Sequence, residues 1–243
     1  MLIGREFSSR DSLMFRPDQE IFLRIDIDSP ADISWFLNVE HAHKTPILFK
    51  ANSDLHPSQW NEGFYNDVIE EHIACAQMLS SHGIKKLVIG ADEDGVLQKM
   101  LAGRFSTMEF NHRMAPLLKI FSHINQIAST TPMVSLTIEE LAPGGLDATD
   151  GVHIALNLEA KGLKEIVVSS GSKDFHPLYK RRSTQKKKMD DEDFRSNEPA
   201  MAAALWLLGR TDLSVFLRSN FDDSQCAKDI AMKLGLKGLI EIG

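Results

Sequence analysis

The chain has 243 residues, of which 43% are hydrophobic, and its formal net charge is −7. This length and apolar content suffice for one buried core, and α/β barrels of this size fold as single domains. The acidic balance argues against broad nucleic-acid affinity. We find no apolar run of signal-peptide or bilayer-spanning length, so we expect a cytoplasmic protein with no membrane association.

Seven short runs have the near-continuous apolar character of parallel strands that are covered on both faces. They are residues 21–26, 46–51, 85–91, 133–138, 165–171, 213–219 and 238–243. Helical spacing of apolar residues predicts four helices, over residues 67–81, 149–161, 199–208 and 224–234. Gly83 and Gly162 would end the first two, and Asp150 could cap the second.

The alternation of strands with glycine-terminated helices indicates βαβ units and a parallel sheet. It predicts an α/β protein in which residues 1–243 form one (β/α)8 barrel of the TIM type. A closed barrel normally has eight strands, so either an eighth strand lies within residues 1–15 or the barrel is incomplete. An open doubly wound sheet is a further alternative, although the GxGxxG that usually follows its first strand is absent.

One long charged segment, residues 173–199, interrupts the alternation after the strand at 165–171. It carries a basic run over residues 180–188 and an acidic run over residues 190–193. Functional loops of barrels follow the carboxyl ends of strands, so an anion clamp is one interpretation. A solvated loop whose charge blocks attract each other is the favoured one.

Acidic residues and cysteines offer few candidates for a metal or catalytic site. Asp26 and Asp28 would share one face of a strand, where capping is a more common role than cation binding. The acidic residues 92–94 lack the further ligands of a calcium loop, so a solvated turn is favoured. Cys75 and Cys226 have no metal-type spacing and indicate buried thiols in a reducing compartment. We therefore predict no metal site.

Residues 131–171 read TPMVSLTIEELAPGGLDATDGVHIALNLEAKGLKEIVVSSG. This segment resembles the old yellow enzyme family of NADH:flavin oxidoreductases. The positions that match in order are Leu141 to Gly145, Asp150, Leu158, Glu159, Gly162 and Ser169 to Gly171. Residues 72–103, 110–120 and 214–243 resemble further segments of that family, so the likeness covers about residues 46–243.

The resemblance implies an eight-stranded βα barrel that holds FMN at the carboxyl ends of its strands. It also implies NAD(P)H-dependent reduction of a small activated alkene. The positions at which the family contacts its flavin fall at Lys50, Ser135, Ser170, Arg218 and Asn220.

The family's substrate-binding His–His or His–Asn pair falls within residues 90–94, which read GADED. No imidazole or amide is present there to polarise a carbonyl, so the catalytic residues stay unassigned. Two functions are consistent with these departures. The chain is either an FMN-dependent oxidoreductase with atypical contacts or a non-catalytic barrel that serves as a binding or assembly partner.

The family's final Gly-Arg step falls at Gly243, and the helix that follows it in the family is not in this sequence. Without that helix, apolar barrel surface would be uncovered. We therefore expect a homo-oligomer or a partner chain to cover it.

Overall fold

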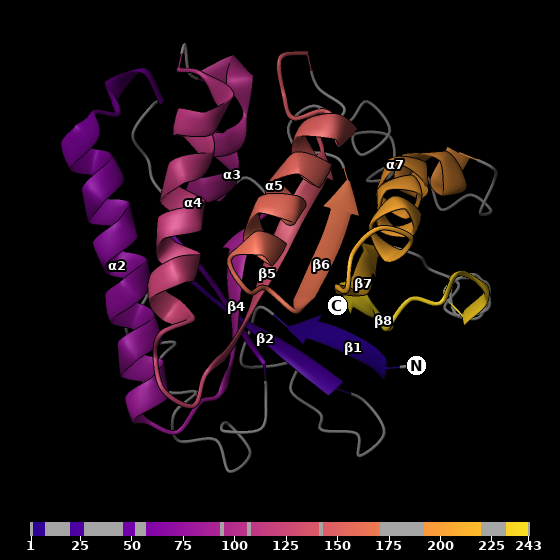
Figure 1. The fold of residues 1–243 in the computed structure, drawn as a ribbon, viewed down its shortest axis with the longest axis horizontal. Coiled ribbons are helices and arrows are strands. Elements are labelled where there is room, and N and C mark those ends of the chain that lie inside the picture. The colour runs from indigo at the N-terminus through magenta and orange to yellow at the C-terminus, as the bar shows by residue number, and fades with distance from the viewer. Residues whose placement is uncertain are drawn as a thin grey trace, which may run out of the picture.

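Eight parallel strands form one closed ring in a computed structural model of the chain (Figure 1). The structure describes residues 2–7, 20–26, 46–51, 57–92, 95–105, 108–140, 143–170, 192–219 and 232–242. The strands are β1 (Leu2–Phe7), β2 (Glu20–Asp26), β3 (Ile47–Lys50), β4 (Lys86–Ala91), β5 (Thr131–Glu139), β6 (Glu165–Ser170), β7 (Ser214–Ser219) and β8 (Gly238–Ile242). Each strand pairs with its neighbours in chain order, and β8 closes the ring by pairing with β1.

The strand predictions are confirmed. All seven predicted runs are strands of the ring, with ends that differ by a residue or two. The eighth strand is β1, which lies within residues 1–15, as one of the sequence alternatives required. The pairing of Gly4 with Ile240 on one side and with Glu20 on the other joins the two ends of the chain in the same sheet.

Helices cover the outside of the strands, and α2, α4, α5 and α7 stand next to one another in that order (Figure 1). The helical elements are η3 (Pro57–Gln59), α2 (Glu62–Ser81), α3 (Val96–Leu101), η4 (Gly103–Phe105), α4 (Phe110–Ile124), α5 (Ala148–Ala160) and α7 (Glu192–Leu208). Within the described ranges, no helix has the length and apolar character needed to cross a membrane.

Two predicted helices begin earlier than the apolar spacing suggested. α2 begins at Glu62 because the Asn61 side chain accepts a hydrogen bond from the Phe64 N–H at 3.0 Å, which caps the first turn. α7 begins at Glu192, so the last residues of the predicted 173–199 loop are helical. Both charge runs of that loop, apart from residues 192–193, and most of the predicted helix at 224–234 lie outside the described residues.

The sequence suggested Asp150 as the cap of α5, but the cap is Asp147. The Asp147 carboxylate accepts the Asp150 N–H at 2.8 Å, so Asp150 is the residue whose donor is satisfied. The predicted helix ends are confirmed: Gly83 and Gly162 have φ of 84° and 102°. Only glycine adopts this left-handed conformation without cost, and it lets the backbone close each helix end with hydrogen bonds to the last turn.

Strand residues alternate between two hydrophobic clusters. Ile47 and Phe49 belong to a large cluster that includes the inner faces of the helices. Leu48, between them, belongs to a smaller cluster built only from strand residues, which are Leu48, Val88, Met133, Val167 and Phe216. Successive residues of a strand point to opposite faces, so the smaller cluster fills the inside of the ring. Burial on both faces explains why the strands are apolar throughout.

Replacing Gly151 with alanine should destabilise the fold, because α5 crosses β5 at this glycine. A Cβ atom there would collide with the carbonyl of Ile138, which is backbone and cannot rotate away. We expect Gly151→Ala to lower the free energy of unfolding by about 1–3 kcal/mol in urea denaturation. Gly209→Ala is the control, because its Cβ would meet ordinary contacts at 3.5 Å or more. Equal stability of the two variants would contradict this packing.

Candidate functional site

A polar layer lies directly above the apolar cluster inside the ring. Two residues beyond each member of that cluster, the strands carry Lys50, Gly90, Ser135, Ser169 and Arg218. Residues two apart on a strand share a face, so this layer lines the inside of the barrel toward the carboxyl ends of its strands. Barrels of this kind carry their functional residues at that end.

An ion pair crosses this layer. Asp92 directly follows β4, and its Oδ2 accepts a hydrogen bond from Nη1 of Arg218 on β7 at 2.6 Å. The same oxygen accepts the hydroxyl of Ser135 on β5. All three side chains are buried, with Asp92 only 1% exposed. The sequence prediction of a solvated turn was therefore wrong for Asp92, while residues 93–94 lie outside the described ranges.

Lys50 reaches the same layer from β3, and the absence of a side chain at Gly90 makes room for it. A Cβ atom at Gly90 would lie 3.0 Å from Cβ of Lys50. Farther along the lysine stem, Cδ would lie 3.5 Å from a Cβ at Gly95, just before α3. The lysine therefore runs over β4 toward the mouth of the barrel, and it is 4% exposed.

The structure brings together three of the five positions predicted to contact a cofactor. Lys50, Ser135 and Arg218 face the inside of the ring, whereas Ser170 alternates with the inward Ser169 and is half-buried at the end of β6. The fifth, Asn220, lies outside the described residues. Asp92 and Ser169 were missed, although counting in steps of two from the apolar inward residues would have found both.

A second buried carboxylate fixes the backbone beyond β5. Glu140 accepts hydrogen bonds from Gln98 Nε2 at 2.8 Å, from Arg104 Nη1 at 2.5 Å and from the Leu146 N–H at 3.1 Å. Its own N–H donates to the Leu146 carbonyl at 3.0 Å. Gly145 allows this approach, because a Cβ atom there would collide with the carboxylate. Glu140 thus ties α3, η4 and the start of α5 to the mouth of the barrel.

Three carboxylates gather where β5 ends and α5 begins. Burial raises the pKa of Glu139, and the neighbouring charge of Asp147 raises it further. The same two causes raise the pKa of Asp150, again with burial first.

Burial also raises the pKa of the Cys75 thiol to about 12, which makes this cysteine unreactive, as a buried thiol should be.

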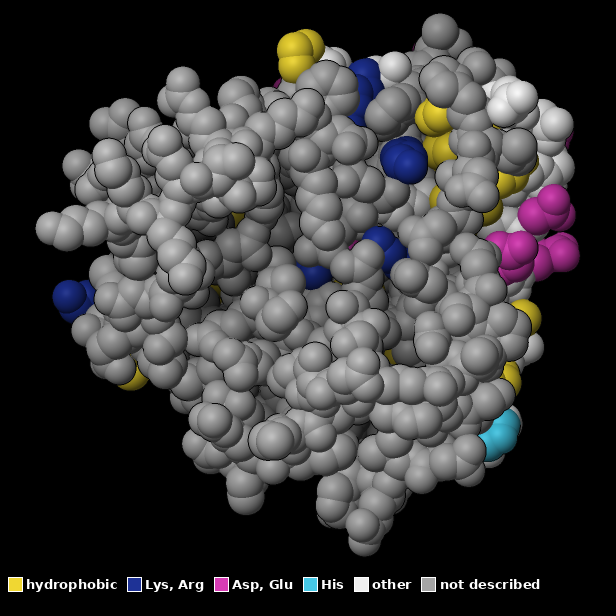
Figure 2. All heavy atoms as spheres, turned by 180° about the vertical axis from the view of Figure 1, so that it is seen from behind, with side chains coloured by type: hydrophobic (Ala, Val, Ile, Leu, Met, Phe, Trp, Pro, Cys, Tyr) yellow, Lys and Arg dark blue, Asp and Glu magenta, His cyan; other side chains and the backbone are white. Residues whose placement is uncertain are grey.

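Figure 2 shows the side of the molecule turned away from the viewer of Figure 1. Among its described residues, Lys and Arg side chains are visible near the middle, near the top and at the left edge, and acidic side chains gather at the right edge. In the parts of the chain that the structure describes, no three His, Cys, Asp or Glu residues lie close enough to hold a metal ion.

Comparison with known proteins identifies the fold. No family model matches the sequence, and no curated protein matches it. 2-Naphthoyl-CoA reductase in complex with 2-naphthoyl-CoA superposes with a TM-score of 0.68 at 11% identity, over 91% of this chain and 42% of that chain. The old yellow enzyme homologue of Zymomonas mobilis superposes with a TM-score of 0.66 at 10% identity, over 99% of this chain and 84% of that chain.

Morphinone reductase in complex with tetrahydroNAD gives a TM-score of 0.66 at 13% identity, over 99% of this chain and 82% of that chain. The chain therefore spans less than half of the naphthoyl-CoA reductase and most of the other two. The predicted TIM-type barrel and its likeness to the old yellow enzyme family are confirmed at the level of the fold. Fold similarity at this identity does not carry an activity.

Removing one partner of the Asp92–Arg218 pair should destabilise the fold more than replacing both partners with apolar residues. We expect Asp92→Leu and Arg218→Met each to lower the free energy of unfolding by about 3–5 kcal/mol, because each leaves a buried charge without its partner. The double variant should lose clearly less than the sum of the two. Urea denaturation of the four proteins measures this coupling, with exposed Asp67→Asn as a control. Additive losses would contradict a direct pair.

Removing the Asp147 charge should change the pH dependence of stability. The pKa values of Glu139 and Asp150 are raised in the folded protein, so their protonated forms favour folding. This contribution is present at acidic pH and is lost as pH rises through the folded pKa values. Asp147→Asn keeps a capping side chain but removes the repulsion. NMR titration should show both pKa values lower in this variant. Unchanged values would contradict the assignment.

Proposed function

We propose that this chain is a non-catalytic barrel with the old yellow enzyme fold, and that it works as a binding or assembly partner. One observation carries the proposal: the carboxylate of Asp92 is bound inside the barrel by Ser135 and Arg218. Those are two of the positions at which the family resemblance predicts flavin contacts.

The residues present do not fit FMN as the family would hold it. A flavin needs a cation near the polar edge of its ring and donors around its phosphate. Here the Arg218 charge is compensated by Asp92 at 2.6 Å. The hydroxyl of Ser135 donates to that same carboxylate. Lys50, Asp92, Ser135 and Arg218 are each 4% exposed or less, so this layer is packed as core.

Substrate activation meets the same difficulty. The position after β4, where the family has its His–His or His–Asn pair, begins with Asp92. A carboxylate held by a guanidinium accepts hydrogen bonds but does not donate one to a substrate carbonyl. We therefore infer that the polar layer holds β4, β5 and β7 together and that the outer surface of the barrel makes the contacts with other molecules. The predicted second copy or partner chain would bind there.

A second candidate is an FMN-dependent oxidoreductase that uses NAD(P)H to reduce a small activated alkene. One specific observation favours it: two cations, Lys50 and Arg218, reach the carboxyl ends of the strands from opposite parts of the sheet order. An anionic group of a ligand at the mouth would be attracted by these two cations.

An absorption measurement separates the two candidates. We expect the purified protein to be colourless and to show no saturable change on titration with FMN, because Asp92 already binds Nη1 of Arg218. Asp92→Ser removes the competing carboxylate and is the matched variant for the same titration. A flavin absorption band in the purified wild-type protein, or its FMN-dependent oxidation of NADH or NADPH, would overturn the non-catalytic proposal.

A further inference from the structure

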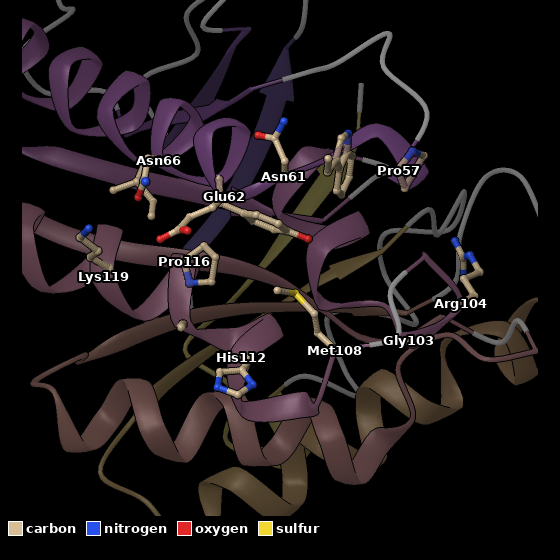
Figure 3. A pocket seen from close by; sticks show the side chains of 14 residues that line it. Pro57, Asn61, Glu62, Asn66, Gly103, Arg104, Met108, His112, Pro116 and Lys119 are labelled. Atoms are coloured by element: carbon tan, nitrogen blue, oxygen red, sulfur yellow. The ribbon is translucent and has the colours of Figure 1, made fainter.

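A cavity of about 830 Å³ lies between α2 and α4, on the outside of the ring and apart from the polar layer (Figure 3). The facing stripes of the two helices form its walls. α2 contributes Glu62, Tyr65, Asn66 and Ile69, and α4 contributes His112, Ala115, Pro116 and Lys119. Both sets follow helical spacing, so each helix presents one continuous face to the cavity. Its volume is in the range of small-molecule sites.

One part of the cavity is aromatic and apolar. Trp60 is stacked on Phe64 with ring centroids 5.0 Å apart, and the ring of Tyr65 stands at 84° to the indole. Trp60 and Tyr65 both line the cavity, and Met108, which is 47% exposed, lies on the opposite side. Rings fixed by their neighbours offer contact area with little loss of side-chain entropy. This part suits the apolar body of a ligand.

Besides Arg104, which is paired with Glu140, the cavity is lined by two opposite charges. Glu62 and Lys119 come from facing helices, and Figure 3 shows both side chains toward the same end of the cavity. Within the described ranges, neither takes part in an ion pair within 4.0 Å. A ligand of one charge would be attracted by one of them and repelled by the other. A ligand that carries both charges satisfies both.

The α4 wall of the cavity contains an additional acceptor. Pro116 lies inside α4 and has no N–H, so the carbonyl of His112 lacks the donor that a regular helix supplies. Both residues line the cavity. A carbonyl acceptor of this kind favours a ligand with a donor such as an ammonium group.

We propose that this cavity is a binding site for an amphoteric small molecule with an apolar or aromatic body, of the chemical class of a free amino acid. The ammonium group faces the Glu62 carboxylate, and the carboxylate faces Lys119. The body of the ligand packs against Trp60, Tyr65 and Met108. The site shares no lining residue with the polar layer inside the barrel, and the proposal does not depend on the proposed function.

Three probes with one shared ring test the site: L-phenylalanine, phenethylamine, which has only the ammonium, and 3-phenylpropionate, which has only the carboxylate. Ligand-observed NMR titration measures their affinities for the full chain. Because Glu62 and Lys119 are exposed, we expect each charge to be worth about a two- to fivefold difference. L-Phenylalanine should therefore bind more tightly than either of the other probes.

Charge-removing variants assign each contact. Glu62→Gln should weaken phenylalanine and phenethylamine by about two- to fivefold and leave 3-phenylpropionate unchanged or tighter. Lys119→Gln should weaken phenylalanine and 3-phenylpropionate by the same factor and leave phenethylamine unchanged or tighter. Glu70→Gln and Lys161→Gln make the same charge changes on exposed positions away from the cavity and should leave all three affinities unchanged. No saturable binding of phenylalanine, or binding that neither cavity variant alters, would overturn the proposal.

Discussion

A charged pair inside a closed barrel constrains how this structure is held together. Moving a carboxylate or a guanidinium out of water costs several kcal/mol, and mutual attraction compensates only when the geometry is good. Asp92 and Arg218 meet at 2.6 Å, and Ser135 supplies a further donor to the same carboxylate oxygen. Because the three residues follow or belong to β4, β7 and β5, their contact requires these strands to curve around the inside of the barrel. The ion pair thus links strands that are distant in sequence.

Glycines determine how closely the elements approach around this pair. Gly90 leaves the space over β4 that the stem of Lys50 occupies, and Gly145 lets the Glu140 carboxylate reach the backbone beyond β5. Gly151 allows α5 to lie against β5 without a collision at Ile138. Each of these positions would place a Cβ atom within about 3 Å of another atom, closer than close-packed interiors allow. The polar layer inside the barrel and the packing of α5 on β5 therefore both depend on glycines.

The barrel separates two places where a ligand could bind, and their chemistry differs. The mouth is the usual functional end of the fold, but Asp92, Ser135 and Arg218 are buried there and bind one another. The cavity between α2 and α4 carries the opposite arrangement, because Glu62 and Lys119 are exposed and not paired with each other. The carboxylate and the guanidinium inside the barrel bind each other. The carboxylate and the ammonium that line the cavity remain available to a ligand.

Sequence alone located seven of the eight strands, because each must be apolar on both faces to lie between the inside of the ring and the helices. It also located the helix ends at Gly83 and Gly162, where the backbone requires a positive φ. It placed Lys50, Ser135 and Arg218 near one site through the family resemblance. Only the tertiary structure decided that Asp92 is buried with Arg218, since these residues are 126 positions apart. Local patterns describe the propensity of a segment, whereas the partner of a buried charge depends on how the sheet closes.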